Sequence, residues 1–122
     1  MRFILKLALT LIAAGFASNS VGNAQVAEQS GMPKTCKGLI SKIVNNLDEK
    51  SIATLRDTEK DDLLKYHFSW GMSIRNSYEL WSEDSPIRKS CAQLVGEQDI
   101  HPDNASSVIM EGVWEVVNNT GM

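Results

Sequence analysis

Apolar residues recur at steps of three and four along most of this chain, and no segment alternates apolar and polar residues as a half-buried β-strand does. The pattern is clearest in four stretches, which begin near residues 36, 59, 86 and 104. Short polar segments separate them, and the chain has no internal repeat or low-complexity tract. These spacings predict an all-α fold, a small four-helix domain around one core.

The N-terminal segment has the layout of a cleaved secretory signal peptide. Arg2 and Lys6 are basic, residues 7–16 (LALTLIAAGF) are apolar, and a stretch of small and polar residues follows. Small residues, Gly22 and Ala24, precede the favoured cut after Ala24. A membrane anchor is the alternative, but a spanning helix needs about 20 apolar residues, and this run is about ten residues long.

Processing at this point predicts a periplasmic or secreted protein. A cut after Ala17 is a less favoured option. No other run is long and apolar enough to cross a bilayer, so we expect no stable membrane insertion after processing. We therefore expect residues 1–24 to be a signal peptide, residues 25–34 a flexible lead-in, and residues 35–122 a single helical domain.

The charge balance excludes one class of partner. The 122 residues carry 12 basic and 15 acidic side chains, a formal net charge of -3, and the pI is about 5.3. Nucleic-acid-binding domains usually show a basic patch and a pI above about 9, so no nucleic-acid partner is expected. Removal of the leader takes away two basic residues and no acidic ones. The more acidic product suits a basic protein partner, although such acidity is also ordinary for solubility.

Cys36 and Cys91 both lie in the expected mature chain. Thiols of exported proteins meet an oxidising compartment and tend to pair, and two cysteines allow one intramolecular bridge. Such a bridge contributes about 4 kcal/mol through the loop that it closes. Two buried thiols that do not meet are the alternative. Without a CxxC pair the spacing does not suit zinc, so neither a metal nor another cofactor is expected.

Local signals place the first two helices. Thr35 is a suitable cap for a helix that begins near Cys36. The segment from Ser51 to Leu55 is expected to be a helical turn or a bend. Thr58 and the acidic residues after it resemble a capping box, and the periodicity predicts one long helix from about Glu59 to Leu80. Gly71 within it indicates either a kink or the close approach of another helix.

Two further helices follow. Ser85 and Pro86 are a good start signal for the third helix, whose expected apolar face contains Leu94 and Val95 besides Ile87 and Cys91, and Gly96 is a suitable left-handed end. Asp103 is expected to cap the last helix, from about Asn104 to Val117. Packing of the third helix on the first would bring the two cysteines together.

Two strings of polar and aromatic residues stand out, and they hold both histidines of the chain. The string HFxxGxxIRNxxxLW begins at His67, and HPDxxSxxI begins at His101. Together they resemble a small bacterial domain family of unknown function, over about Leu63 to Val117. The resemblance implies a helical domain without an established activity, whose members mostly lack a leader. The signal peptide and the cysteine pair depart from that pattern.

The strings allow a structural and a chemical interpretation. In the structural one, a charge-assisted pair between Arg75 and Asp103 pins the last helix to the long helix, and the three tryptophans fill the core. In the chemical one, the two histidines converge with Arg75 and Asp103 in an acid–base pocket. A metal site is less favoured, because no two of these ligands are spaced i, i+4. The positions of interest are His67, Arg75, Asn76, Trp81, His101 and Asp103.

No P-loop, GxSxG, HExxH or GxGxxG motif occurs, so no catalytic residue is assigned. The favoured interpretation is an exported, non-catalytic protein-interaction module, such as a periplasmic inhibitor or an immunity-like protein. The alternative is a small enzyme or small-molecule binder that uses the His/Arg/Asp pocket. An exposed Trp70 or Trp81 beside acidic residues favours the interaction module, whereas buried or widely separated imidazoles exclude the pocket.

Overall fold

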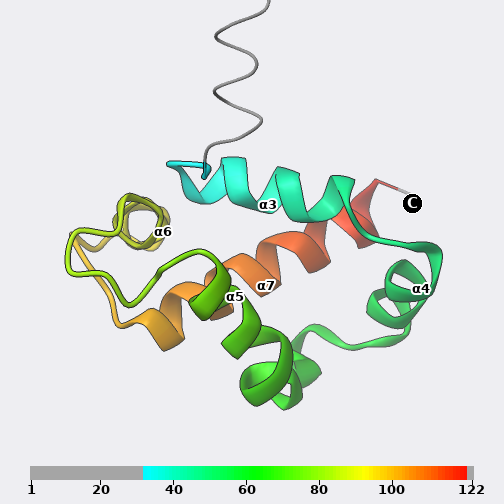
Figure 1. The fold of residues 1–122 in the computed structure, drawn as a ribbon. Helices are drawn as coiled ribbons and strands as arrows, with labels where there is room; N and C mark the ends of the chain where they lie inside the picture. Colours follow the sequence, from blue (N-terminus) through cyan, green and yellow to red (C-terminus); the bar gives the residue numbers. More distant parts are fainter. Residues whose placement is uncertain (1–31, 121–122) are drawn as a thin grey trace, which may run out of the picture. The chain divides into compact units, whose positions relative to one another are not determined.

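Residues 32–120 of the computed structural model are described here, and they contain five α-helices and no β-strand, which confirms the all-α class (Figure 1). The fifth helix arises because the expected turn near Ser51 is a full helix. The predicted signal peptide and the lead-in as far as residue 31 lie outside the described residues. The α-helices are α3 (Cys36–Asn45), α4 (Glu49–Asp57), α5 (Met72–Ser77), α6 (Pro86–Leu94) and α7 (Pro102–Asn119).

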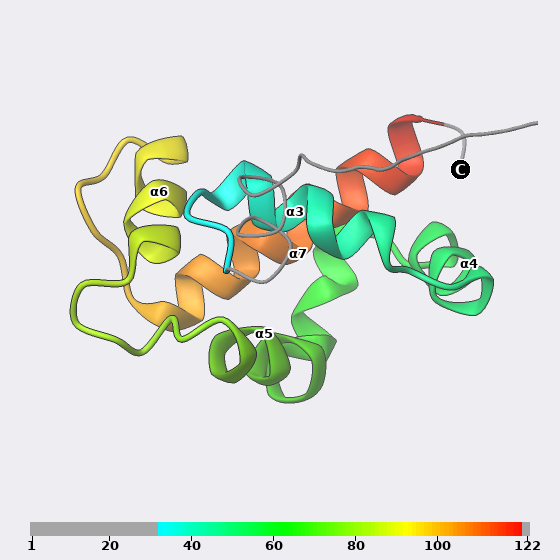
Figure 2. The ribbon, with the colours of Figure 1, turned by 45° about the horizontal axis from the view of Figure 1, so that its top comes forward.

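Helix α7 is the central element of the unit that begins at Pro33. Every other helical element packs against it, and it passes between α3 and α5 (Figures 1 and 2). Helices α4 and α6 lie towards opposite ends of α7 in both views. The core is therefore built around the apolar face of α7, which buries Ala105, Ile109, Met110, Val113 and Val117.

The predicted disulfide is present between Cys36 at the start of α3 and Cys91 in α6. Both cysteines are fully buried. The backbone N–H of Cys36 also donates to Ser90 Oγ at 2.8 Å, so the two helices are joined by a hydrogen bond beside the bridge. The expected packing of the third predicted helix on the first is confirmed.

Three predicted helix boundaries are confirmed by the hydrogen bonds at the helix ends. The Thr35 side chain accepts from the Gly38 N–H and starts α3, and the Ser85 side chain accepts from the Arg88 N–H and starts α6. Gly96 has a φ of 80°, and its N–H and that of Glu97 bond back to the last turn of α6. This is the pattern of a Schellman end, in which glycine carries the left-handed conformation without strain.

The predicted long helix from Glu59 to Leu80 is wrong. The segment consists of a 3-10 helix, η2 (Lys60–Tyr66), a π-helix, η3 (His67–Gly71), and the short α5. Thr58 belongs to the end of α4, because its hydroxyl donates to the Thr54 carbonyl at 2.7 Å, and its own carbonyl accepts from Trp114 Nε1. It therefore caps no following helix, and the expected capping box does not form.

The expected apolar face of α6 is only partly correct. Ile87 and Cys91 are buried, but Leu94 and Val95 are 47% and 52% exposed. Leu94 is the last residue of α6 and Val95 its C-cap, and both line a groove of about 610 Å³ along α3 and α7. None of the helices described between residues 32 and 120 is long and apolar enough to cross a bilayer.

Candidate functional site

The carboxylate of Asp103, in the first turn of α7, is the meeting point of the residues selected from the sequence. Its Oδ1 lies 3.4 Å from Arg75 Nε, and its Oδ2 lies 3.7 Å from His67 Nε2 and 3.8 Å from His101 Nδ1. These groups come from η3, α5 and the start of α7, so the convergence is produced by tertiary packing. We call the residues around this carboxylate the Asp103 cluster: His67, Arg75, Asn76, Trp81, His101 and Asp103.

Arg75 is the buried centre of this cluster, and it forms the predicted ion pair with Asp103, at 3.4 Å and without a hydrogen bond. The side chain is 2% exposed. Its Nη1 donates to Ser106 Oγ at 2.8 Å, and its Nη2 donates to the His67 carbonyl at 3.0 Å. One guanidinium thereby joins α5, η3 and α7. Among the described residues, its Nε is the one buried side-chain polar atom without a hydrogen bond.

Gly71 lies directly against this guanidinium. A Cβ at Gly71 would lie 3.1 Å from Arg75 Nη1 and 3.4 Å from Met110 Cε, which is tighter than side chains normally pack. From the sequence, Gly71 indicates either a kink or the close approach of another helix. The structure shows the close approach of α7, through Met110, and it shows that the glycine also makes room for an arginine four residues later.

His101, and not Asp103, caps α7. The His101 Nδ1 accepts a hydrogen bond from the Asp103 backbone N–H at 3.0 Å. The expected capping role of Asp103 is therefore wrong, because Pro102 occupies the first helical position and shifts the start of the helix by two residues. Since Nδ1 must offer a lone pair to accept this bond, it donates no proton to the nearby Asp103 carboxylate.

Trp81 lies at the outer edge of the cluster and is 55% exposed, so the expectation that all three tryptophans fill the core is wrong. Its Nε1 donates to Asn76 Oδ1 at 3.2 Å, and its ring meets the His101 ring edge-on at 5.8 Å between centroids. At the other end, the ring of Phe68, which is 80% exposed, stands edge-on to His67 at 4.7 Å. The cluster thus has a buried charged centre and an aromatic rim.

Arg88 and Asp99 position this rim, and they were not selected from the sequence. Arg88 Nε and Nη2 bind both carboxylate oxygens of Asp99, at 2.8 and 3.0 Å. The same guanidinium donates to the carbonyls of Leu80, Ser82 and Glu83, on either side of Trp81. The ion pair lowers the pKa of Asp99 from 3.8 to about 2. The sequence signal that could have identified Arg88 is the position of an arginine in the first turn of an amphipathic helix, beside its apolar face.

Among the described residues the cluster does not have the geometry of a metal centre, and it lies outside the two pockets described in this structure. No group of three His, Cys, Asp or Glu side chains in residues 32–120 is arranged to hold a metal ion. The groove along α3 and α7 and a pocket beside α4 are lined by other residues. What the Asp103 cluster and the neighbouring Phe68 offer chemically is a surface of two aromatic rings, two imidazoles and one carboxylate that is already held by Arg75.

The fold and this cluster define a class: a small, all-α, disulfide-bridged domain whose central helix is braced by a buried arginine. Residues 32–116 match the model of a family described as a domain of unknown function, DUF6794. The match covers well over half of the chain, so the chain belongs to this family. It begins before α3 and thus takes in more than the segment from residue 63 that carries the two strings. No curated protein and no solved structure matches the chain.

Proposed function

We propose that this chain is an exported, non-catalytic protein-binding domain whose partner docks on the rim of the Asp103 cluster around Trp81. The single observation that carries the proposal is the exposed indole. It is held from two sides, by a hydrogen bond to Asn76 and by the edge of the His101 ring. A large aromatic side chain that is exposed yet held in place loses little conformational freedom on binding, and tryptophan is enriched among the residues that dominate interface energies.

The partner that fits this surface presents lysine or arginine side chains. Glu79, Glu83 and Asp84 flank Trp81 in the sequence and are all exposed. Asp84 pairs with Lys89 at 3.4 Å, whereas neither Glu79 nor Glu83 forms an ion pair with any residue between 32 and 120. The nearby Arg88 is committed to Asp99. A cation brought to this turn therefore meets uncompensated acidic groups and the face of an indole, which attracts cations.

Export is the second part of the proposal, and the layout of residues 1–24 supports it together with the disulfide. Mass spectrometry of the protein from the producing cell tests it. We expect the mature chain to begin at Gln25 and to be recovered from outside the cytoplasm with Cys36 and Cys91 joined. An intact N-terminus in the cytoplasmic fraction would contradict export.

Site-specific photo-cross-linking tests the binding surface. The full chain, with a photoreactive phenylalanine derivative in place of Trp81, is irradiated in the producing cell. We expect one dominant adduct with a protein that has a basic surface, and Glu83→Lys in the same chain should remove it. Val95 is the matched control position, because it is equally exposed but lies at the far end of α6. The same adducts at both positions, or none at Trp81, would refute the surface.

Convergence of two imidazoles on one carboxylate oxygen favours the acid–base pocket as a second candidate function. The variant His101→Asn separates the two candidates, because asparagine is a good helix cap and no general base. Protein binding around Trp81 should persist in this variant, with a modest loss from the missing ring contact. Loss of function in His101→Asn and in His67→Gln, with an unchanged melting temperature, would favour the pocket.

A further inference from the structure

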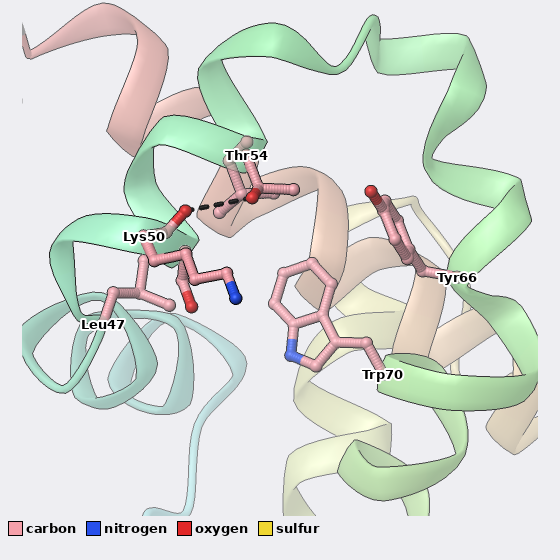
Figure 3. A pocket seen from close by; sticks show the side chains of 7 residues that line it. Leu47, Lys50, Thr54, Tyr66 and Trp70 are labelled. Atoms are coloured by element: carbon pink, nitrogen blue, oxygen red, sulfur yellow. Dashed lines mark hydrogen bonds between the residues drawn. The ribbon is translucent and has the colours of Figure 1, made fainter.

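A pocket of about 400 Å³ lies between α4 and the segment that runs through η2 and η3 (Figure 3). Its walls are formed by Leu47, Leu55 and the rings of Tyr66 and Trp70, and Lys50 stands at its edge. In Figure 3 the Lys50 side chain extends across the pocket towards the Trp70 indole. The volume is in the range of natural small-molecule sites, which combine apolar walls with a few convergent polar groups.

Two nitrogen donors at this pocket, Trp70 Nε1 and Lys50 Nζ, have no protein partner among residues 32–120, whereas the hydroxyl of Thr54, which also lines the pocket, donates to the Lys50 carbonyl at 3.0 Å. The indole N–H groups of Trp81 and Trp114 donate to Asn76 and to the Thr58 carbonyl. The Trp70 N–H makes no hydrogen bond within residues 32–120. Lys50 Nζ likewise has no carboxylate within 4.0 Å among these residues. Two unengaged donors, one of them charged, thus stand over an apolar floor.

We propose that this pocket binds a small organic carboxylate with an apolar body. The carboxylate would accept a charge-assisted hydrogen bond from Lys50 Nζ and a second one from Trp70 Nε1, as charged acceptors favour such donors. The apolar body would lie against the ring of Trp70 and the side chains of Leu47 and Leu55, whose burial is favourable. A neutral molecule of the same shape would gain only the contribution from burying its apolar body. The site is distinct from the Trp81 surface, because none of the residues that line it belongs to the Asp103 cluster or to the acidic residues around Trp81.

Octanoate is a suitable probe, and octanol is its neutral counterpart. Titration calorimetry with the full chain should give a dissociation constant for octanoate below about 1 mM, as expected for a ligand of this size, and binding of octanol at least tenfold weaker. Lys50→Met should weaken octanoate binding at least tenfold, to the level of octanol. Lys34→Met removes the same charge from an exposed lysine that does not line the pocket, and it should change binding less than twofold.

Nuclear magnetic resonance locates the binding. The chain has three tryptophans, and their indole N–H signals are assigned by single Trp→Phe variants. Octanoate should move the Trp70 signal and leave those of Trp81 and Trp114 in place. Equal binding of octanol, equal loss in the two lysine variants, no binding at 1 mM, or a shift of the Trp81 signal instead would each overturn the proposal. Apart from a shift of the Trp81 signal, none of these outcomes bears on the protein-binding surface around Trp81.

Discussion

Glu79 adopts a backbone conformation that glutamate rarely takes. Its φ is 56°, and it is the one non-glycine residue with a positive φ between residues 32 and 120. It follows the end of α5, where the Leu80 N–H bonds back to the Arg75 carbonyl at 3.0 Å. A glycine is the usual residue at this point of a helix end. The strained turn buries Leu80 and leaves the next residue, Trp81, exposed.

The variant Glu79→Gly should therefore be more stable than the natural chain. A left-handed conformation costs roughly 1–2 kcal/mol for a residue with a Cβ, part of which is offset by the greater freedom of glycine in the unfolded state. We expect a gain of about 0.5–1 kcal/mol in the free energy of unfolding, measured by denaturant titration. Glu83→Gly, in an exposed turn without a positive φ, should give no gain. A loss of stability in Glu79→Gly would show that the carboxylate itself makes a stabilising contact.

At the level of elements, the crossing of α3 and α7 depends on Gly112. A Cβ added at this residue would lie 3.1 Å from Ile40 Cγ1 and closer still to Ile40 Cδ1. The two helices can approach closely at this point because Gly112 of α7 has only a hydrogen atom as its side chain. The glycine is costly within a helix, by about 1 kcal/mol relative to alanine, so the close approach must offset that cost through packing.

A double-mutant cycle tests this crossing. Gly112→Ala should destabilise the chain by about 1–2 kcal/mol, because overpacking outweighs the gain in helix propensity. In the background of Ile40→Val, which removes Cδ1, the same substitution should be neutral or stabilising. Denaturant unfolding of the four variants gives the coupling, which we expect to exceed about 1 kcal/mol. Strictly additive effects would show that the two residues do not compete for space.

The loop between α6 and α7 is held to α6 by the pair between Arg88 and Asp99. The hydrogen bonds from Arg88 lower the pKa of Asp99 to about 2. Because the pKa is lower in the folded than in the unfolded state, the stabilisation is fully present above the unfolded value near 4. It is lost as the pH falls through about 2, below which the carboxylate is protonated in both states.

Asp99→Asn should make the melting temperature depend less steeply on pH at acidic pH. We expect the melting temperature of the natural chain to fall more steeply between about pH 4 and pH 2 than that of this variant, measured by circular dichroism. Asp84→Asn is the matched control, because Asp84 forms a longer and more exposed pair with Lys89, and its profile should follow that of the natural chain. Parallel profiles for the natural chain and Asp99→Asn would contradict the assigned pKa.

At the scale of the whole molecule, the disulfide is the main covalent constraint. It joins residues separated by 55 positions, and closing a loop of this length stabilises a fold by about 4 kcal/mol on the chain-entropy model. Small domains have a total stability of only about 5–15 kcal/mol. Stability of this domain should therefore depend strongly on the redox state of its surroundings.

Reduction should lower the melting temperature of the protein by more than about ten degrees, since 1 kcal/mol corresponds to roughly 4–8 °C in a domain of this size. The double variant Cys36→Ala/Cys91→Ala should melt at about the temperature of the reduced protein, and a reducing agent should not change it further. Thiol titration confirms that the bridge is open. An unchanged melting temperature after complete reduction would contradict a stabilising role for the bridge.

Several features of the molecule were predictable from local sequence because local chemistry decides them. The caps at Thr35 and Ser85 and the glycine end at Gly96 each depend on a side chain or backbone freedom within a few residues. The helical class follows from periodicity, and the pairing of Arg75 with Asp103 follows from the few charged groups that border the apolar stripe. The cysteine pair follows from there being only two.

Tertiary structure alone decided the remaining features. Periodicity in the sequence does not distinguish one α-helix from a 3-10 and a π segment in succession. The hydrogen-bond partners of the buried Arg75 guanidinium, Ser106 and the His67 carbonyl, are brought to it only by the fold. Exposure of Trp81 depends on the left-handed Glu79 and on Arg88, which holds the backbone around it. Residue types and spacing thus determine which helices form, whereas the surface that this protein presents depends on contacts between residues far apart in the chain.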